Sequence, residues 1–129
     1  MQTLSDVMRD TFVEVAPEDT LGEVAERMTA LDMGAVVVKD FGRLIGILTE
    51  RDLLKAMAAR VHSSDARARE WMTEDPITAA ADTDVEAAAD VMLEHGFRHL
   101  PVVDEGGTVI GLVSLRRVVA AAKSAVERA

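Results

Sequence analysis

The sequence has no cysteine and no tyrosine, and it lacks any long hydrophobic run. Without cysteine the chain can form no disulfide bond, no thiolate nucleophile and no cysteine-ligated zinc site. Its longest uninterrupted apolar stretches, such as residues 34–38, span four or five residues. A membrane-spanning helix needs about 20. The chain also begins without a basic region followed by an apolar one, so we expect no secretory signal. These absences predict a cytoplasmic protein with no membrane partner.

Positive charge and aromatic side chains are also scarce. Lys and Arg number 14 against 23 Asp and Glu, which gives a formal net charge of −9. The acidic excess is spread over both halves of the chain, so neither half offers the basic face that nucleic-acid phosphates require. The aromatic residues are too few for a base-stacking platform; they are Phe12, Phe41, Phe97 and Trp71. We expect no nucleic-acid partner, whereas a small anionic ligand would need only a local cluster of donors.

What the chain does have is an internal repeat, within an ordinary globular composition of 49% hydrophobic and 29% charged residues. An offset of 64 residues places Val7-Met8 over Trp71-Met72. After one inserted residue, Ile45-Gly46 falls on Ile110-Gly111. We assign the two copies and the polar linker that joins them to residues 7–61, 71–125 and 60–70.

Each copy reads as strand, helix, strand, strand, helix, which predicts an α+β fold of two βαββα units with internal pseudo-twofold symmetry. In the first copy, a capping box at Thr20 and Glu23 starts a helix that we expect Gly34 to end. In the second copy, Asp84 and Gly96 bound the equivalent helix. The strands are expected at residues 11–15, 35–39, 44–48, 76–79, 99–103 and 108–113, and the closing helices at 50–59 and 115–125.

The pattern that carries chemistry lies where each hairpin runs into its closing helix. The first copy reads Gly46-Ile-Leu-Thr49 and the second Gly111-Leu-Val-Ser114. The start of a helix presents unpaired amides that attract phosphate, and a hydroxyl there can donate to a phosphate oxygen. Asp52, one turn later, could accept both hydroxyls of a ribose, and Gly46 would let a flat base approach the backbone. A capping box explains Thr49 and Asp52 equally well when they are taken alone, and a bulge explains Gly46.

This duplicated arrangement resembles the cystathionine-β-synthase (CBS) domain family. The resemblance covers nearly the whole chain and rests on two stretches, Asp40-Phe-Gly-Arg-Leu-Ile-Gly-Ile-Leu-Thr-Glu-Arg-Asp52 and Phe97-Arg-His-Leu-Pro-Val-Val-Asp104. Membership implies two βαββα motifs packed sheet against sheet as one CBS pair, with two clefts between them. Such clefts commonly hold AMP, ADP, ATP or S-adenosylmethionine.

The resemblance assigns roles to individual residues. Thr49 resembles the phosphate-side hydroxyl, and Asp52 resembles the carboxylate that binds ribose. Arg98 and His99 match the place of phosphate-contacting basic residues. Ile77 and Thr78 resemble the wall beside the base.

The second cleft departs from this pattern. Ser114 keeps the hydroxyl, but Arg117 stands where the ribose-binding carboxylate should be, and a guanidinium cannot accept hydrogen bonds from a diol. The basic pair Arg98-His99 has only Gly34-Ala35 as its counterpart in the first copy. We therefore expect one good site rather than two.

No catalytic residue and no metal site are predicted. The only histidines are His62, His95 and His99, and Gly96 interrupts the face that the last two would share. There is no nucleophile beside a base and no Walker-type phosphate loop.

We expect a regulatory module, not an enzyme, that binds an adenosine-containing ligand and modulates an effector protein that the sequence does not identify. The resemblance implies a homodimer, for which the Ala- and Val-rich closing helix at residues 115–125 is the expected face. The alternative is an interaction or scaffolding protein with vestigial clefts, which Arg117 and the unduplicated basic pair favour.

Overall fold

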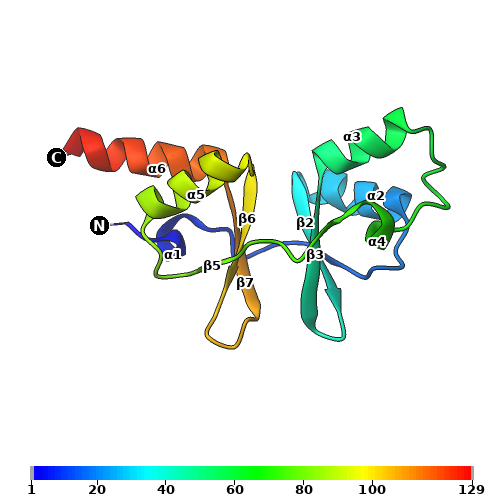
Figure 1. The fold of residues 1–129 in the computed structure, drawn as a ribbon, viewed down its shortest axis with the longest axis horizontal. Coiled ribbons are helices and arrows are strands. Elements are labelled where there is room, and N and C mark those ends of the chain that lie inside the picture. Colours follow the sequence, from blue (N-terminus) through cyan, green and yellow to red (C-terminus); the bar gives the residue numbers. More distant parts are fainter. Residues whose placement is uncertain (1, 129) are drawn as a thin grey trace. The chain divides into compact units, whose positions relative to one another are not determined.

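A computed structural model describes residues 2–128, and for residues 125–128 it describes the backbone alone. The chain divides into two compact units (Figure 1). The N-terminal unit is Phe12–Pro76, and the C-terminal unit combines the residues up to Thr11 with those from Ile77 onward. No helix in the part of the chain that the structure describes has the length and apolar character needed to cross a membrane.

The N-terminal unit is a four-stranded sheet in the order β1-β2-β3-β4. Strand β1 runs parallel to β2, and the other pairs are antiparallel. Its elements in chain order are β1 (Glu14–Val15), α2 (Leu21–Leu31), β2 (Ala35–Asp40), β3 (Arg43–Thr49), α3 (Glu50–Ala58), α4 (Ala68–Trp71) and β4 (Thr73–Glu74).

The C-terminal unit is a three-stranded sheet in the order β5-β6-β7, with β5 parallel to β6 and β6 antiparallel to β7. Its elements are α1 (Leu4–Val7), β5 (Ala79–Ala80), α5 (Val85–His95), β6 (His99–Val103), β7 (Val109–Ser114) and α6 (Leu115–Arg128). The expected α+β class and the order within each copy are therefore correct.

The short opening strands are shorter than the sequence predicts. Strand β1 begins at Glu14 rather than at residue 11, and β5 begins at Ala79 rather than at residue 76. Each pairs with its neighbour through two residues only, Glu14 and Val15 with Val37 and Val38, and Ala79 and Ala80 with Val102 and Val103.

Helix α2 starts as predicted but ends before the expected glycine. The Thr20 hydroxyl accepts a hydrogen bond from the Glu23 amide at 3.1 Å and donates to its carboxylate at 3.0 Å. The left-handed residue that closes the helix is Asp32 (φ 51°), not Gly34. Aspartate tolerates this conformation because its short polar side chain bonds locally. Gly96 does end α5 in that conformation, as expected (φ 75°).

Each unit has its own apolar core. In the N-terminal unit Val36 and Val38 of β2, together with Leu48, belong to one core cluster with Val24 and Met28 of α2. In the C-terminal unit Leu100, Val102 and Val113 lie against α5 and α6. The core strands read as continuous apolar runs because the valines of β2 are buried on both faces of the sheet.

The stretch at residues 60–70, expected to be a polar linker, makes specific contacts with the N-terminal unit. Ala66 is buried, and its carbonyl accepts from the Leu21 amide at 3.0 Å. The Ser63 carbonyl accepts from Gly22 at 2.9 Å, and a Cβ on Gly22 would lie 3.3 Å from that oxygen. Helix α4 already begins at Ala68, so this stretch is fastened to the N-terminal unit.

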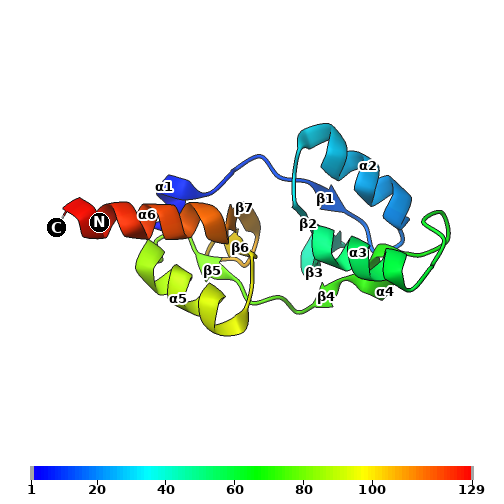
Figure 2. The ribbon, with the colours of Figure 1, turned by 90° about the horizontal axis from the view of Figure 1, so that it is seen from above.

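The two sequence copies are offset from the two units at their leading ends. Residues 2–9, which we call the leading segment, carry α1 and join the C-terminal unit, where α1 contacts α6 (Figure 2). The equivalent residues 66–73, which we call the α4 segment, belong to the N-terminal unit. Each unit thus combines the body of one copy with the segment that leads into the other.

Candidate ligand-binding site

The first candidate residues lie where β3 runs into α3. Thr49 is the last residue of β3 and the N-cap of α3. The Asp52 Oδ2 atom accepts hydrogen bonds from the Thr49 amide at 2.9 Å and from the Thr49 hydroxyl at 3.1 Å. Both residues are half-buried. The capping interpretation is therefore confirmed, and because both bonds use Oδ2, the Oδ1 atom of Asp52 takes no part in the cap.

The equivalent position in the C-terminal unit is built differently. The Ser114 hydroxyl accepts from the Arg117 amide at 3.3 Å, and the first turn of α6 has no acidic residue. The Arg117 side chain is exposed. This helix start therefore carries positive charge from the backbone and from a guanidinium, with no carboxylate in its own first turn to offset it.

Arg98 and His99 lie beside this helix start. His99 is the first residue of β6 and stands opposite Ser114 in the β6–β7 register. The Arg98 carbonyl accepts from the Leu115 amide at 2.8 Å. Arg98 is exposed and His99 is half-buried. The hairpin therefore brings Arg98, His99 and Ser114 together at one end of the sheet.

The two residues expected beside the base lie before β5, not within a strand. Ile77 is 39% exposed, and Thr78 is exposed as well. The parallel register pairs Ala79 with Val102, so Ile77 and Thr78 precede β5 on the side where β6 begins at His99.

The candidates therefore fall into two groups. Thr49 and Asp52 belong to the N-terminal unit, where their side chains meet. The other six belong to the C-terminal unit; they are Ile77, Thr78, Arg98, His99, Ser114 and Arg117. Among the described residues, no group of three or more His, Asp or Glu side chains could hold a metal ion.

The proposed role of Gly46 in admitting a flat base was wrong, because a methionine fills the space above this residue. A Cβ on Gly46 would collide with the Met72 sulfur and would lie 2.9 Å from its Cγ atom. Gly111 has the same relation to Met8, whose Cγ atom would lie 3.0 Å away. Each glycine therefore accommodates the methionine of the segment that completes its unit.

These two methionines are the residues that sequence reasoning missed. Their contacts join positions about 26 and 103 residues apart, so no local pattern predicts them. The available signal was the recurrence of both partners: the repeat that aligns Met8 with Met72 also aligns Gly46 with Gly111.

A family model for the CBS domain matches the chain twice, over residues 4–59 and 68–124. The chain belongs to the CBS-domain family. Both matches begin at the short helices α1 and α4, a few residues before residues 7 and 71, at which we assigned the start of the two sequence copies. The expected tandem of CBS motifs is thereby confirmed.

Relatives and solved structures agree with this assignment. An uncharacterized 17.7 kDa protein of Acidianus ambivalens is 40% identical over 114 residues, which are 88% of this chain and 68% of that protein. The CBS domain protein PAE2072 from Pyrobaculum aerophilum, solved with AMP, has a TM-score of 0.83 and 28% identity, covering 90% of this chain and 89% of its own. The CBS domain pair of protein MJ0100, solved with 5′-methylthioadenosine and S-adenosyl-L-methionine, has a TM-score of 0.85 and 25% identity, covering 93% and 98%.

Proposed function

We propose that this CBS pair is a regulatory module that binds an adenosine-containing ligand of the AMP, ADP or ATP class and has no catalytic activity of its own. The observation that carries the proposal is the placement of Asp52, a half-buried carboxylate whose Oδ1 atom the helix cap leaves unused. Similar CBS structures solved with AMP and with S-adenosyl-L-methionine support the ligand class.

Asp52 and Thr49 recognise different parts of this ligand, the ribose and the phosphate side. The Asp52 carboxylate accepts from the ribose hydroxyls, which would distinguish a ribonucleotide from its 2′-deoxy form. The Thr49 hydroxyl and the amides at the start of α3 serve the phosphate side.

The C-terminal unit contributes a different chemistry. Arg98 and His99 bind phosphate oxygens, while Ile77 and Thr78 lie against the base. Ser114 and Arg117 offer an anion site without a ribose acceptor, so a ligand held there would be recognised by charge and not by its sugar.

The regulation that we propose acts in trans on an effector protein, from a homodimer. Exposed apolar side chains on α3 support association: Leu54 is 66% exposed and Met57 is 74% exposed. Val119, the residue of α6 that is equivalent to Leu54, is 39% exposed. We propose α3 and α6 as the faces that meet in the dimer.

A scaffolding protein without a ligand is the second candidate, and two observations favour it. The capping bonds alone account for Thr49 and Asp52, and Arg117 removes the ribose acceptor from the second position. The two candidates differ in whether the protein binds a ligand, to whose affinity Asp52 would contribute in the first of them.

A thermal-shift panel with AMP, ADP, ATP, S-adenosylmethionine, GMP and 2′-deoxy-AMP separates them. A ligand at about 100 times its dissociation constant adds about 2.7 kcal/mol of stability, which moves the midpoint by several degrees. We expect adenosine ligands to raise the midpoint and 2′-deoxy-AMP to raise it less.

The decisive variant is Asp52→Ala. A hydrogen bond to a charged group contributes about 1.5–3 kcal/mol, so this change should weaken an adenosine ligand by roughly tenfold or more. The matched control is Glu23→Ala, which removes the capping carboxylate of α2 in the same unit and should leave affinity unchanged. No shift with any ligand would favour the scaffold, whereas equal affinity in the wild type and Asp52→Ala would show that Asp52 acts as a helix cap alone.

A further inference from the structure

The leading segment docks on the C-terminal unit through backbone hydrogen bonds. The Leu4 amide donates to the Thr83 carbonyl, and the Ser5 amide donates to the Ala81 carbonyl, each at 2.9 Å. Arg9 exchanges two hydrogen bonds with Leu112 at the edge of β7, at 2.9 and 3.0 Å. These bonds add a short extended stretch to the edge of a three-stranded sheet.

Side chains complete the docking. Leu4 is fully buried and Val7 nearly so, and both belong to the core of the C-terminal unit. Met8 lies over Gly111, where a side chain of any size would displace it. The C-terminal unit therefore has a built receptor for a segment with the pattern Leu-x-x-Val-Met.

The N-terminal unit holds the α4 segment by the same set of bonds. The Ala68 amide donates to the Asp19 carbonyl and the Arg69 amide donates to the Pro17 carbonyl, each at 2.9 Å. Thr73 pairs with Ile47 at the edge of β3. The α4 segment reaches its place from α3, after the body of its unit, whereas the leading segment precedes β1. The two segments therefore dock in the same way although they are joined to the chain differently. The docking depends on the residues of the segment and not on how the segment is connected.

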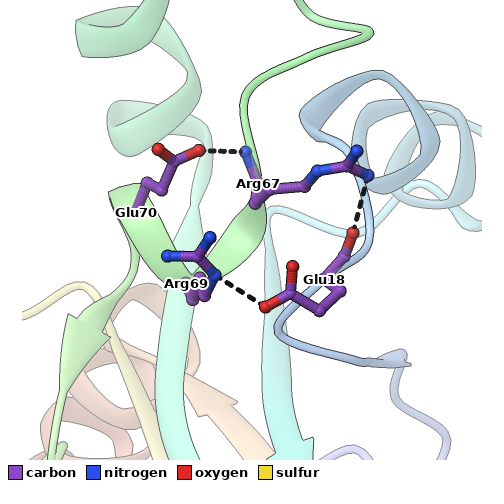
Figure 3. A network of polar contacts seen from close by, with 4 residues as sticks. All are labelled: Glu18, Arg67, Arg69 and Glu70. Carbon is purple, nitrogen blue, oxygen red and sulfur yellow. Dashed lines mark hydrogen bonds and ion pairs between the residues drawn. The ribbon is translucent and has the colours of Figure 1, made fainter.

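The two segments differ in how many polar contacts hold them. The Arg69 Nε atom pairs with Glu18 Oε1 at 2.6 Å, and Arg67 Nη1 donates to the Glu18 carbonyl at 3.0 Å (Figure 3). The residue equivalent to Arg69 in the leading segment is Ser5, which forms no ion pair. Among the described residues, both ion pairs lie in the N-terminal unit. The leading segment is therefore the one held without ionic contacts.

We propose that the leading segment also docks on the C-terminal unit of a second copy of the chain, so that two copies exchange residues 2–9 and form a dimer. The exchange re-forms every contact described above, as in other swaps of identical elements between protomers. The change of path is confined to residues 10–12, which lie outside helices and strands and are not buried. The proposal does not depend on any ligand.

A disulfide between two chains tests the exchange, because the natural sequence has no cysteine. Chains carrying Ser5→Cys and chains carrying Ala81→Cys are unfolded together, refolded at high concentration and oxidised. Docking within one chain cannot join the two introduced cysteines, whereas docking on a second copy can. We expect a covalent dimer, and peptide mass spectrometry should locate its disulfide between positions 5 and 81.

Two controls calibrate this result. The double variant Ser5→Cys/Ala81→Cys should form the link within one chain, which shows that the geometry allows it. The pair Ser5→Cys with Glu105→Cys places the second cysteine on the exposed turn between β6 and β7 and measures random collision. The proposal requires several times more dimer than this pair gives, and an equal yield would overturn it.

Complementation gives an independent measurement. Leu4→Asp disables the segment and Gly111→Val blocks its receptor, so each variant alone should lose protection from hydrogen exchange in β7 and α6. Refolded together, the two variants still contain one intact segment and one intact receptor. We expect about half of the β7 protection to return, together with a species of twice the chain mass. A mixture that behaves as the sum of its parts would contradict the exchange.

Discussion

Asp52 and Arg117 stand at equivalent places, each three residues after the hydroxyl that ends a strand. The carboxylate bonds to the backbone of the strand end and leaves one oxygen for other partners. The guanidinium can only donate, so the start of α6 depends on the longer bond from the Arg117 amide to Ser114. One residue therefore determines whether a duplicated turn accepts hydrogen bonds or repels cations.

Local chemistry made the Thr49–Asp52 box predictable, because a cap depends on residues three positions apart. The packing of Met72 on Gly46 was not predictable in this way. This packing depends on which segment of the chain covers β3, and tertiary contacts determine that segment.

Replacing Gly46 or Gly111 by alanine should destabilise the unit that contains it. The new Cβ meets a methionine and also a backbone carbonyl, of Thr73 at 3.0 Å or of Arg9 at 3.1 Å. Such overpacking costs about 1–3 kcal/mol, measured by urea unfolding. Gly106→Ala is the matched control, because its Cβ would meet only the Asp104 carboxylate at 3.5 Å and should be nearly neutral. Equal stability of all three variants would mean that the methionines move aside freely.

At the scale of elements, the hairpins, the long helices and the presence of the opening strands β1 and β5 followed from the sequence, whereas α1, α4 and β4 did not. Strands β2, β3, β6 and β7 are apolar runs bounded by turn residues, and the helices have clear periodicity or caps. Strands of two residues and helices of four are too short to show any period. Elements α1 and α4 exist because a neighbouring sheet edge and core receive them.

Leu4→Ala tests how much α1 contributes. Leu4 is fully buried although it lies in a four-residue helix. Truncating a buried leucine costs about 2–5 kcal/mol, and we expect that loss in the C-terminal unit. Hydrogen exchange should quicken in α5, α6 and β7, while the strands of the N-terminal unit keep their protection. The adjacent exposed residue gives the control, Ser5→Ala, which should change little.

At the scale of the whole molecule, the repeat was evident from the sequence, but the composition of the folded units was not. The internal repeat groups the leading segment and the α4 segment each with the body that follows it in the sequence. In the structure the leading segment joins the later body, because its receptor is formed by β5, β7 and α6. No sequence pattern predicts on which of the two similar units a segment will dock.

The homodimer that we propose predicts the effect of a charge on α3. Met57→Glu places a carboxylate on the exposed apolar stripe and should shift the molecule toward monomer in sedimentation at several concentrations. Lys55→Glu changes charge on a different face of the same helix and should have less effect. A wild-type monomer at every concentration, or equal dissociation by both changes, would argue against α3 as the dimer face.

The split of the C-terminal unit between both ends of the chain has a consequence for synthesis on the ribosome. Residues 12–76 can complete their unit as soon as they have emerged, but the leading segment must wait for α6. At about 5–20 residues per second, the roughly 120 residues that follow the leading segment take about 6–24 s to translate. Throughout that interval Leu4, Val7 and Met8 have no receptor on their own chain. Nascent chains on neighbouring ribosomes of one messenger RNA could meet during this time, before either segment is committed.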